Sequence, residues 1–483
     1  MKNKNLSKLR LLASTATLAV GLMAASAANA AVTLRIFNIN GAGVGFNDAT
    51  PVAPVGGNPG TTLGQQRINA FVFAAQKWGA TLTSNVEVRI IAQFSALTCT
   101  ATGAVLGSAG ATTIFSDFPN APLAETWYSG ALADKLAGED LDPFDGTTGT
   151  VDISANFNVN LGNPGCLTGT PFYLGLDNNH GLAVDFVTVL THEMGHGLGF
   201  QTFTNGSSGA QIQGIPSVWD HFLYDNTSGL NWTQMSNAQR VASAINTNNL
   251  VWTGANVTAA APQVLLGVPR LVVSGPAAGA SAGTYDVGLA SFGPLLTNTA
   301  ASGDVMPISN GGVNGEGCLA FSAADKLAVT GNVALISRGV CGFAVKVKNA
   351  QLAGALGVII ADNVAGAAPP GLGGADPTIT IPTVSVTLAD ATKLRAALVK
   401  RSRAKSGVIG AMGRNPLVLA GTDALGRVRM YAPNPFQGGS SVSHYDISAS
   451  RNLLMEPAIN ADLTHEVTVP FDLTLQLFQD IGW

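Results

Sequence analysis

The sequence predicts an α+β domain that is interrupted by an inserted α/β domain. Strand-like and helical patterns alternate after residue 31 and lead to an apolar helical stripe near residue 190. Between residues 262 and 414 the pattern changes to short Val/Ile/Leu runs separated by helical segments, and after Leu417 the first pattern returns. We therefore expect a leader at residues 1–30, a discontinuous first domain made of residues 31–260 and 416–483, and an insertion at residues 261–415.

The leader has the three parts of a secretory signal peptide. Positive residues come first, Leu11–Ala25 are apolar, and Ala28-Asn29-Ala30 has the small-x-small pattern of a cleavage site. We therefore expect a secreted, extracellular protein that is cleaved near Ala30. No later stretch reaches 18 uninterrupted apolar residues, so the sequence predicts no membrane anchor.

Charge and cysteine content narrow the classes of partner. With a net charge of -4 and 11% charged residues, the chain lacks the basic excess that binding to nucleic acid requires. The four cysteines, none in a C-x-x-C pair, are expected to form two disulfides in an exported chain. Three pairings are possible, and proximity along the chain favours Cys99 with Cys166 and Cys318 with Cys341.

The first domain is expected to open with a small sheet. Residues 32–36 alternate as a strand, residues 63–78 have helical apolar spacing, and residues 86–94 form a second strand. Residues 151–159 alternate again. We interpret them as the sheet-edge strand along which an extended peptide aligns.

The segment Thr191–Phe200 contains H-E-x-x-H within the apolar stripe of a predicted helix. On a helix, His192 and His196 stand one turn apart on one face, where two neutral imidazoles can bind one zinc ion. Glu193 then lies beside the open coordination position and can take a proton from a zinc-activated water. Gly197 and Gly199 predict a sharp turn just after the second ligand. The motif therefore indicates one catalytic zinc ion.

This run resembles the metzincin pattern H-E-x-x-H-x-x-G-x-x-H, although Thr202 stands where that pattern has its third ligand. A catalytic zinc takes three protein ligands and keeps an open position, so a third ligand is expected elsewhere. His444 is the preferred candidate, because Met455 and Pro457 follow it as in the third ligand and Met-turn of metzincins. The long separation is closest to the leishmanolysin-like branch. The resemblance implies a zincin-like catalytic domain in which Met455 packs beneath the metal site.

Other ligand candidates are weaker. His180 lies in a polar turn, His221 lies in an amphipathic stretch, and His465 is expected to be solvated near the C-terminus. A glutamate ligand would have to follow the helix closely, and the next glutamate is Glu316 in the predicted insertion.

The insertion resembles a protease-associated (PA) domain. The resemblance rests on Gly331–Phe343, Lys346–Gln351 and Gly354–Asn363. These segments predict a strand, a helix over residues 343–353 and a second buried strand, and a strand at 381–386 with a helix at 389–399 completes the core. The resemblance implies a role in substrate selection or in access to a neighbouring protease.

After Leu417 the chain is expected to rejoin the first domain. Leu473, Leu477, Phe478 and Ile481 form an apolar helical stripe that should dock as its last helix. Folding must then bring His444 next to His196.

These residues predict a secreted zinc endopeptidase that acts on protein or peptide substrates. Zinc held by His192, His196 and His444 would polarise the scissile carbonyl while Glu193 acts as general base. Tyr445 is a candidate for holding the tetrahedral oxyanion, on its position beside His444 alone.

Two alternative functions stay open at this point. One is a secreted PA-domain binding protein with a structural or vestigial zinc site, which Glu193 disfavours because structural zinc needs no general base. The other is a zinc hydrolase acting on a non-protein substrate, such as an ester or a cell-wall amide. Calcium is possible but unsupported at the acidic loop of Glu139–Asp142 and Asp145, which lacks the EF-hand spacing. Cleavage preference and oligomeric state stay open.

Overall fold

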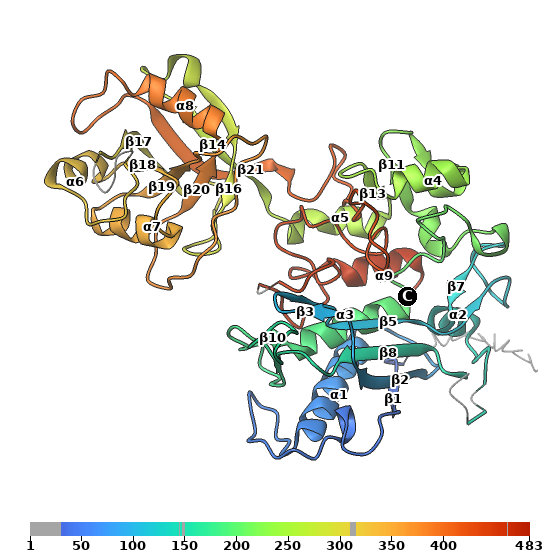
Figure 1. The fold of residues 1–483 in the computed structure, drawn as a ribbon. Coiled ribbons are helices and arrows are strands. Elements are labelled where there is room, and N and C mark those ends of the chain that lie inside the picture. The colour runs from blue at the N-terminus through green and yellow to red at the C-terminus, as the bar shows by residue number, and fades with distance from the viewer. Residues whose placement is uncertain (1–29, 144, 147–149, 310–314, 461) are drawn as a thin grey trace, which may run out of the picture.

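The computed structural model describes residues 30–143, 145–146, 150–309, 315–460 and 462–483. The predicted signal peptide, except Ala30, lies outside these residues. Figure 1 shows a larger body that contains the blue, green and red parts of the chain, and a smaller body in yellow and orange. Strands β14 and β21 lead from the larger body into the smaller one (Figure 1).

The larger body is built on a four-stranded sheet of order β1-β2-β8-β5, with further short strands and six α-helices among the described residues. Strands β1, β2 and β8 are parallel, and β5 is antiparallel to β8. Its strands are β1 (Leu34–Asn38), β2 (Val88–Ser95), β3 (Cys99–Thr100), β4 (Gly103–Ala104), β5 (Gly107–Ala111), β6 (Ile114–Phe115), β7 (Tyr128–Ser129), β8 (Ile153–Asn158), β9 (Phe172–Tyr173), β10 (Val184–Asp185), β11 (Leu223–Asp225), β12 (Leu230–Asn231) and β13 (Leu250–Trp252). Its helices are α1 (Leu63–Thr81), α2 (Gly130–Ala137), α3 (Phe186–Leu198), α4 (Asn237–Ser243), α5 (Ala255–Val264) and α9 (Thr474–Ile481).

The edge of this sheet differs from the prediction. The strand predicted at residues 151–159 exists as β8, but it lies inside the sheet between β2 and β5. The edge beyond it is β5, whose sequence is Gly-Ser-Ala-Gly-Ala. Strands are recognised in a sequence by β-branched and aromatic residues, and β5 has none of them. This is why the sequence did not predict β5 as a strand.

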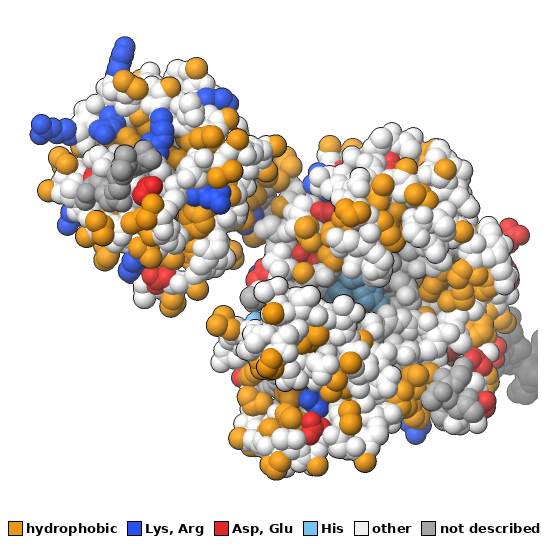
Figure 2. Space-filling model, viewed as in Figure 1, with side chains coloured by type: hydrophobic (Ala, Val, Ile, Leu, Met, Phe, Trp, Pro, Cys, Tyr) orange, Lys and Arg blue, Asp and Glu red, His pale blue; other side chains and the backbone are white. Residues whose placement is uncertain are grey.

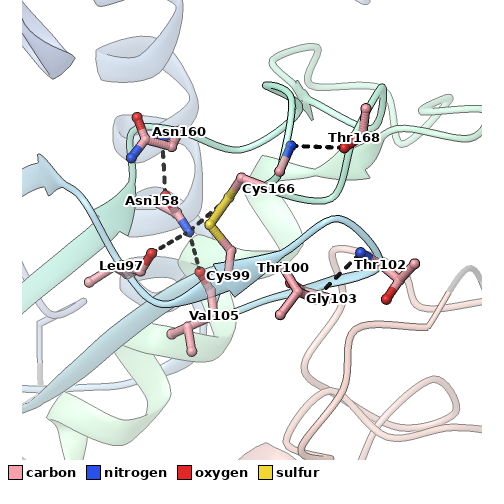
Figure 3. The surroundings of a disulfide bond; sticks show 11 residues. Leu97, Cys99, Thr100, Thr102, Gly103, Val105, Asn158, Asn160, Cys166 and Thr168 are labelled. Atoms are coloured by element: carbon pink, nitrogen blue, oxygen red, sulfur yellow. Dashed lines mark hydrogen bonds between the residues drawn. A yellow bond between two sulfur atoms is a disulfide. The ribbon is translucent and has the colours of Figure 1, made fainter.

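A disulfide holds the chain that leads into β5 (Figure 3). Cys99 at the start of the β3–β4 hairpin is bonded to Cys166, which follows β8. Beside it, the Asn158 amide donates to the carbonyl of Val105 at 2.9 Å (Figure 3). The second disulfide joins Cys318 and Cys341, so both favoured pairings are confirmed.

One hydrophobic core joins the two distant parts of the chain. It contains buried residues from Val32 to Leu265 and again from Val428 to Ile481. Helix α9 is the expected last helix, and its Leu477, Phe478 and Ile481 are buried in this core. Helix α5 crosses the boundary expected at residue 260, because Ala261 and Val264 pack into the same core.

The smaller body is an α/β unit with an eight-stranded sheet of order β15-β14-β21-β17-β18-β19-β20-β16. Its four central strands, β17 to β20, are parallel. Its elements are β14 (Gly267–Ser274), β15 (Gly283–Asp286), β16 (Gly288–Leu289), β17 (Ala301–Pro307), α6 (Ala323–Val329), β18 (Val333–Ser337), α7 (Phe343–Leu352), β19 (Gly357–Ala361), β20 (Thr383–Val386), α8 (Leu388–Ala397) and β21 (Ile409–Leu419).

Helices cover both faces of this sheet. Ala391 and Leu394 of α8 pack with Leu335 on one face, whereas Val347 of α7 packs with Ile336 on the other. The strands and helices predicted between residues 331 and 399 are therefore present, within two residues of the expected bounds at most ends. No helix among the described residues has both the length and the apolar character needed to cross a membrane.

Candidate metal centre

Helix α3 carries the H-E-x-x-H motif and has a defined start and end. Asp185 caps its start, since the Asp185 carboxylate accepts a hydrogen bond from the Thr188 N–H at 2.7 Å. The helix ends at Gly199, whose φ of 125° lies in the region that favours glycine. Gly197, which the sequence assigned to the turn, lies inside the helix instead. A Cβ on Gly197 would lie 2.4 Å from Ile153 of β8, so this glycine permits close packing of α3 on the sheet.

The opposite flank of α3 packs on α1 and on the segment around Met455. The Trp78 indole of α1 donates to the Thr191 carbonyl at 3.2 Å. A Cβ on Gly195 would lie 2.9 Å from the Met455 sulfur, so the small residue lets the methionine reach the helix. Met455 is fully buried, as expected for an apolar floor.

The structure brings His192, His196 and His444 together. The Nε2 atoms of His192 and His196 lie 3.1 Å apart, and those of His196 and His444 lie 3.2 Å apart. Among the described residues, these three form the one group of His, Cys, Asp or Glu side chains with a geometry suited to holding a metal ion. The fold thus brings together His196 and His444, which are 248 positions apart in the sequence.

Each of the three imidazoles is oriented by a backbone carbonyl. His192 Nδ1 lies 2.7 Å from the Leu454 oxygen, His196 Nδ1 lies 2.8 Å from the Phe200 oxygen, and His444 Nδ1 lies 2.8 Å from the Ser440 oxygen. A carbonyl can only accept, so each Nδ1 carries the hydrogen and each Nε2 presents a lone pair. Three lone pairs that face one another repel unless a cation lies between them.

The donor set fits zinc. Tetrahedral zinc with Zn–N bonds of about 2.0–2.1 Å requires ligand nitrogens about 3.3 Å apart, close to the two spacings observed. Burial lowers the pKa of His192 to about 4 and of His196 to about 3, and it lowers the pKa of His444 well below its ordinary value. The imidazoles are therefore neutral at pH 7, which metal ligation requires.

Glu193 lies between the metal helix and the edge strand. Its carboxylate accepts a hydrogen bond from the Ala109 N–H of β5, and burial raises its pKa to about 8. A cation at the three imidazoles would lower that pKa, since opposite charge favours the carboxylate. A Cβ on Gly107 of β5 would lie 2.9 Å from Glu193 Oε1, so the edge strand passes directly over this side chain.

The site lies at the floor of a hollow. Figure 2 shows pale-blue histidine side chains at the bottom of a depression in the larger body. His192, Glu193, His196 and His444 each keep between 5% and 8% of their surface exposed. The four side chains are thus largely buried but still reach the surface of the protein.

The other predicted candidates do not join the site. His180 Nδ1 bonds the Ala183 carbonyl, His221 Nε2 lies 3.2 Å from Thr126 Oγ1, and Thr202 donates to Asp220. Glu316 lies in the smaller body, where its carbonyl accepts from Lys346.

Two expectations about single residues are wrong. His465 is buried rather than solvated, and its Nε2 lies 2.9 Å from Asp185 at the start of α3. Tyr445 is fully buried, and its hydroxyl donates to the Leu473 carbonyl at 3.2 Å. Because that hydroxyl is already committed inside the core, Tyr445 is not available to an oxyanion.

Asp472 is a supporting residue that the sequence did not indicate. Its Oδ2 accepts from the Leu454 N–H at 2.6 Å, and the Leu454 carbonyl in turn bonds His192. Its Oδ1 accepts from the Thr474 N–H at 2.7 Å at the start of α9. An Asp before a predicted helix signals a cap, but nothing local indicates that the same residue also supports a predicted ligand, His192, 280 positions away.

The acidic loop has protein partners at two of its carboxylates. Asp140 pairs with the Arg89 guanidinium, and Asp145 accepts a hydrogen bond from the Thr150 hydroxyl at 3.1 Å. These contacts use oxygens that a calcium ion would need.

Comparison with known proteins identifies the smaller body. The PA domain family matches residues 301–394, so the chain contains a PA domain. A probable lipoprotein aminopeptidase, LpqL, of Mycobacterium tuberculosis is 46% identical over 71 residues, which cover 15% of this chain and 14% of that protein.

Among solved structures, a zinc aminopeptidase from Bacillus subtilis is similar at 22% identity with a TM-score of 0.22, covering 32% of each chain. An aminopeptidase from Aneurinibacillus sp. strain AM-1 is similar at 21% identity with a TM-score of 0.23, also covering 32% of each. This chain thus spans less than a third of the length of these relatives, and their whole activities do not transfer to it.

Proposed function

We propose that this protein is a secreted zinc endopeptidase of the metzincin type, with a leishmanolysin-like arrangement in which a PA domain is inserted between the second and third ligands. The observation that carries the proposal is the convergence of three buried imidazole lone pairs beside Glu193. Met455 beneath α3 supports the metzincin assignment. The catalytic domain then consists of the two segments that share the larger core.

A zinc ion held by His192, His196 and His444 would supply a Lewis acid and lower the pKa of the attacking water. The proton transfers are assigned to residues of the protein. Glu193 accepts the proton of that water and delivers it to the leaving amine as the peptide bond breaks. The N–H of Ala109 holds the Glu193 carboxylate in place for both transfers.

Strand β5 supports a peptide substrate rather than an ester or an amide of another kind. It is the edge of the sheet, and no described strand pairs with its outer side. An extended peptide can add to such an edge through main-chain hydrogen bonds. Because β5 also contacts Glu193, a peptide on this edge would run past the catalytic group.

The test uses residues 31–483 and the variant Glu193→Gln, with Glu139→Gln as the exposed control. Zinc content and casein hydrolysis are measured on each sample. We expect near-equimolar zinc in all three, with chelator-sensitive hydrolysis that falls about 10²–10⁴-fold in Glu193→Gln alone. Equal hydrolysis by Glu193→Gln would exclude the proposed base, and zinc without hydrolysis would favour a binding protein or another substrate class.

A zinc aminopeptidase is the second candidate function, since the similar protein from Mycobacterium tuberculosis is described as a probable lipoprotein aminopeptidase. The two activities differ in their need for a free amino terminus. Cleavage of an internal bond in an N-acetylated peptide would support the endopeptidase. Activity restricted to peptides with free amino termini would support the aminopeptidase.

A further inference from the structure

The PA domain contains a cavity of about 510 Å³ that the proposed catalytic site does not use. It lies at the carboxyl ends of the parallel strands, since residues following β17, β18 and β19 line it. Helix α8 forms another wall with Leu388, Ala391, Thr392 and Arg395, which recur at helical spacing. In open α/β sheets, this end of the strands is where ligands bind, and the volume lies in the range of small-ligand pockets.

Of the two arginines that line this cavity, Arg395 is the one without a carboxylate partner among the described residues. Its Nη2 donates to the Ser337 hydroxyl at 2.8 Å, and no described carboxylate lies within 4.0 Å of its guanidinium. Burial lowers the pKa of Arg395, but arginine stays charged in proteins. A half-buried guanidinium with most of its N–H groups unused is a site for a planar anion.

The other charges of the cavity define what kind of anion fits. Arg338 is paired with Asp362 at 2.9 Å, so this pair contributes no net charge. Glu316 also lines the cavity and has no cationic partner within 4.0 Å among the described residues. Apart from the paired Arg338 and Asp362, the lining carries one cation, Arg395, and one carboxylate, Glu316, whose charge also acts on Lys346. A polyanion such as a phosphate ester would be repelled by Glu316, whereas a single carboxylate on a ligand with donor groups would not.

We propose that this cavity binds the carboxylate of a short peptide, with the carboxylate on Arg395 and the amide or ammonium N–H groups of the peptide facing Glu316. The arginine fork matches a carboxylate with two parallel hydrogen bonds. Ser337 holds the fork in place from the end of β18. The carboxylate is either the C-terminus of the peptide or an acidic side chain. This site is separate from the three histidines and does not depend on the proposed hydrolysis.

The experiment measures binding by calorimetry to residues 31–483 and to two variants. Arg395→Gln removes the proposed anchor, and Arg403→Gln makes the same charge change at an exposed arginine of the same domain. The probes are trialanine with a free C-terminus, its C-terminal amide, and N-acetyl-Ala-Glu-Ala amide. Circular dichroism and zinc content show whether each variant has the fold of the parent.

We expect trialanine to bind the parent and Arg403→Gln equally, and to bind Arg395→Gln about tenfold more weakly or worse. If neither amide probe binds, the site recognises the C-terminal carboxylate of a peptide. If the glutamate peptide binds, the site also recognises acidic side chains. If Arg395→Gln does not fold, Arg395→Lys replaces it, and a several-fold loss is expected because lysine lacks the fork. Equal binding by parent and variant, or no binding of any carboxylate probe, would overturn the proposal.

Discussion

The two bodies of the molecule differ in how fully the protein satisfies the hydrogen-bonding groups of the polar side chains at their candidate binding sites. In the larger body, each histidine of the metal centre has its outer nitrogen satisfied by a carbonyl, and only the three inner lone pairs remain. In the PA domain, Arg395 has one protein partner and an open cavity beside it. The three histidines are already oriented without a ligand, which suits a tightly bound ion. The arginine beside an open cavity suits a ligand that binds reversibly.

The bodies also differ in how the chain builds them. The PA domain comes from one continuous stretch, so its strands and helices follow one another along the sequence. The larger body takes two histidines of its proposed metal centre, His192 and His196, from one segment and the third, His444, from another. Its site depends on long-range packing, and substitutions that weaken the junction of the two segments should therefore act on the metal.

The largest expected effect is that of His444→Ala. Removing the one ligand from the second segment should abolish stoichiometric zinc and lower casein hydrolysis by more than about 100-fold, beyond the usual effect of a residue that only supports a ligand. His180→Ala is the control, because His180 bonds only within its own turn. Zinc content by elemental analysis checks the result, and full zinc in His444→Ala would show that another residue is the third ligand.

Asp472→Asn tests the packing between the two chain segments without changing any of the three histidines. Asp472 accepts hydrogen bonds on both oxygens, and the amide nitrogen of Asn would face a donor instead. We expect affinity for zinc to fall about 10–100-fold, as for other residues that orient a ligand. Competition with a chelator measures this affinity. An unchanged zinc affinity would mean that the Leu454 carbonyl is held without Asp472.

A smaller effect is expected from Gly107→Ala on the edge strand. The new methyl group would lie 2.9 Å from Glu193 Oε1 and must displace it. Since small misplacements of a catalytic group are costly, kcat/KM should fall about tenfold or more while zinc stays bound. Gly103→Ala is matched to it, because its nearest neighbour would be 3.8 Å away. Normal activity of Gly107→Ala would separate β5 from the catalytic group.

The smallest effect concerns the pH dependence of stability at Asp134, far from either site in the sequence. Burial raises the pKa of Asp134 to about 7, with its neighbour Asp152 raised to about 6 by the same cause. A carboxyl group whose pKa is raised on folding stabilises the fold below its unfolded value of about 3.9, and this contribution is lost as pH rises through about 7.

Asp134→Asn should therefore reduce the fall of Tm between pH 5 and 8 by about 2 °C or more. Calorimetry at each pH gives Tm, and Glu139→Gln serves as the control. A slope identical to that of the parent would show that Asp134 keeps an ordinary pKa in the folded protein.

Local patterns predicted what depends on local chemistry. The spacing of His192, Glu193 and His196 predicted a helix with both histidines on one face, and Met455 near Pro457 pointed to His444, which lies beside them. The alternation of apolar runs predicted the strands and helices of the smaller body, because its elements are sequential and well separated by turns. The resemblance of residues 331–363 to a known family predicted that this body is a PA domain.

Long-range contacts explain what the sequence did not reveal. Strand β5 is made of Gly, Ser and Ala, without the residues that mark a strand, and its Gly107 passes close to Glu193. Tyr445 and His465 have partners, Leu473 and Asp185, that only the fold brings near. Likewise, only the fold shows that Arg395 bonds Ser337 and has no carboxylate partner among the described residues.

The most direct test of the central claim is anomalous diffraction at the zinc absorption edge from crystals of residues 31–483. We predict a single strong peak per chain, about 2.0–2.1 Å from Nε2 of His192, His196 and His444. A peak that lacks contact with His444, or the absence of any peak among the three imidazoles in zinc-containing crystals, would contradict the account.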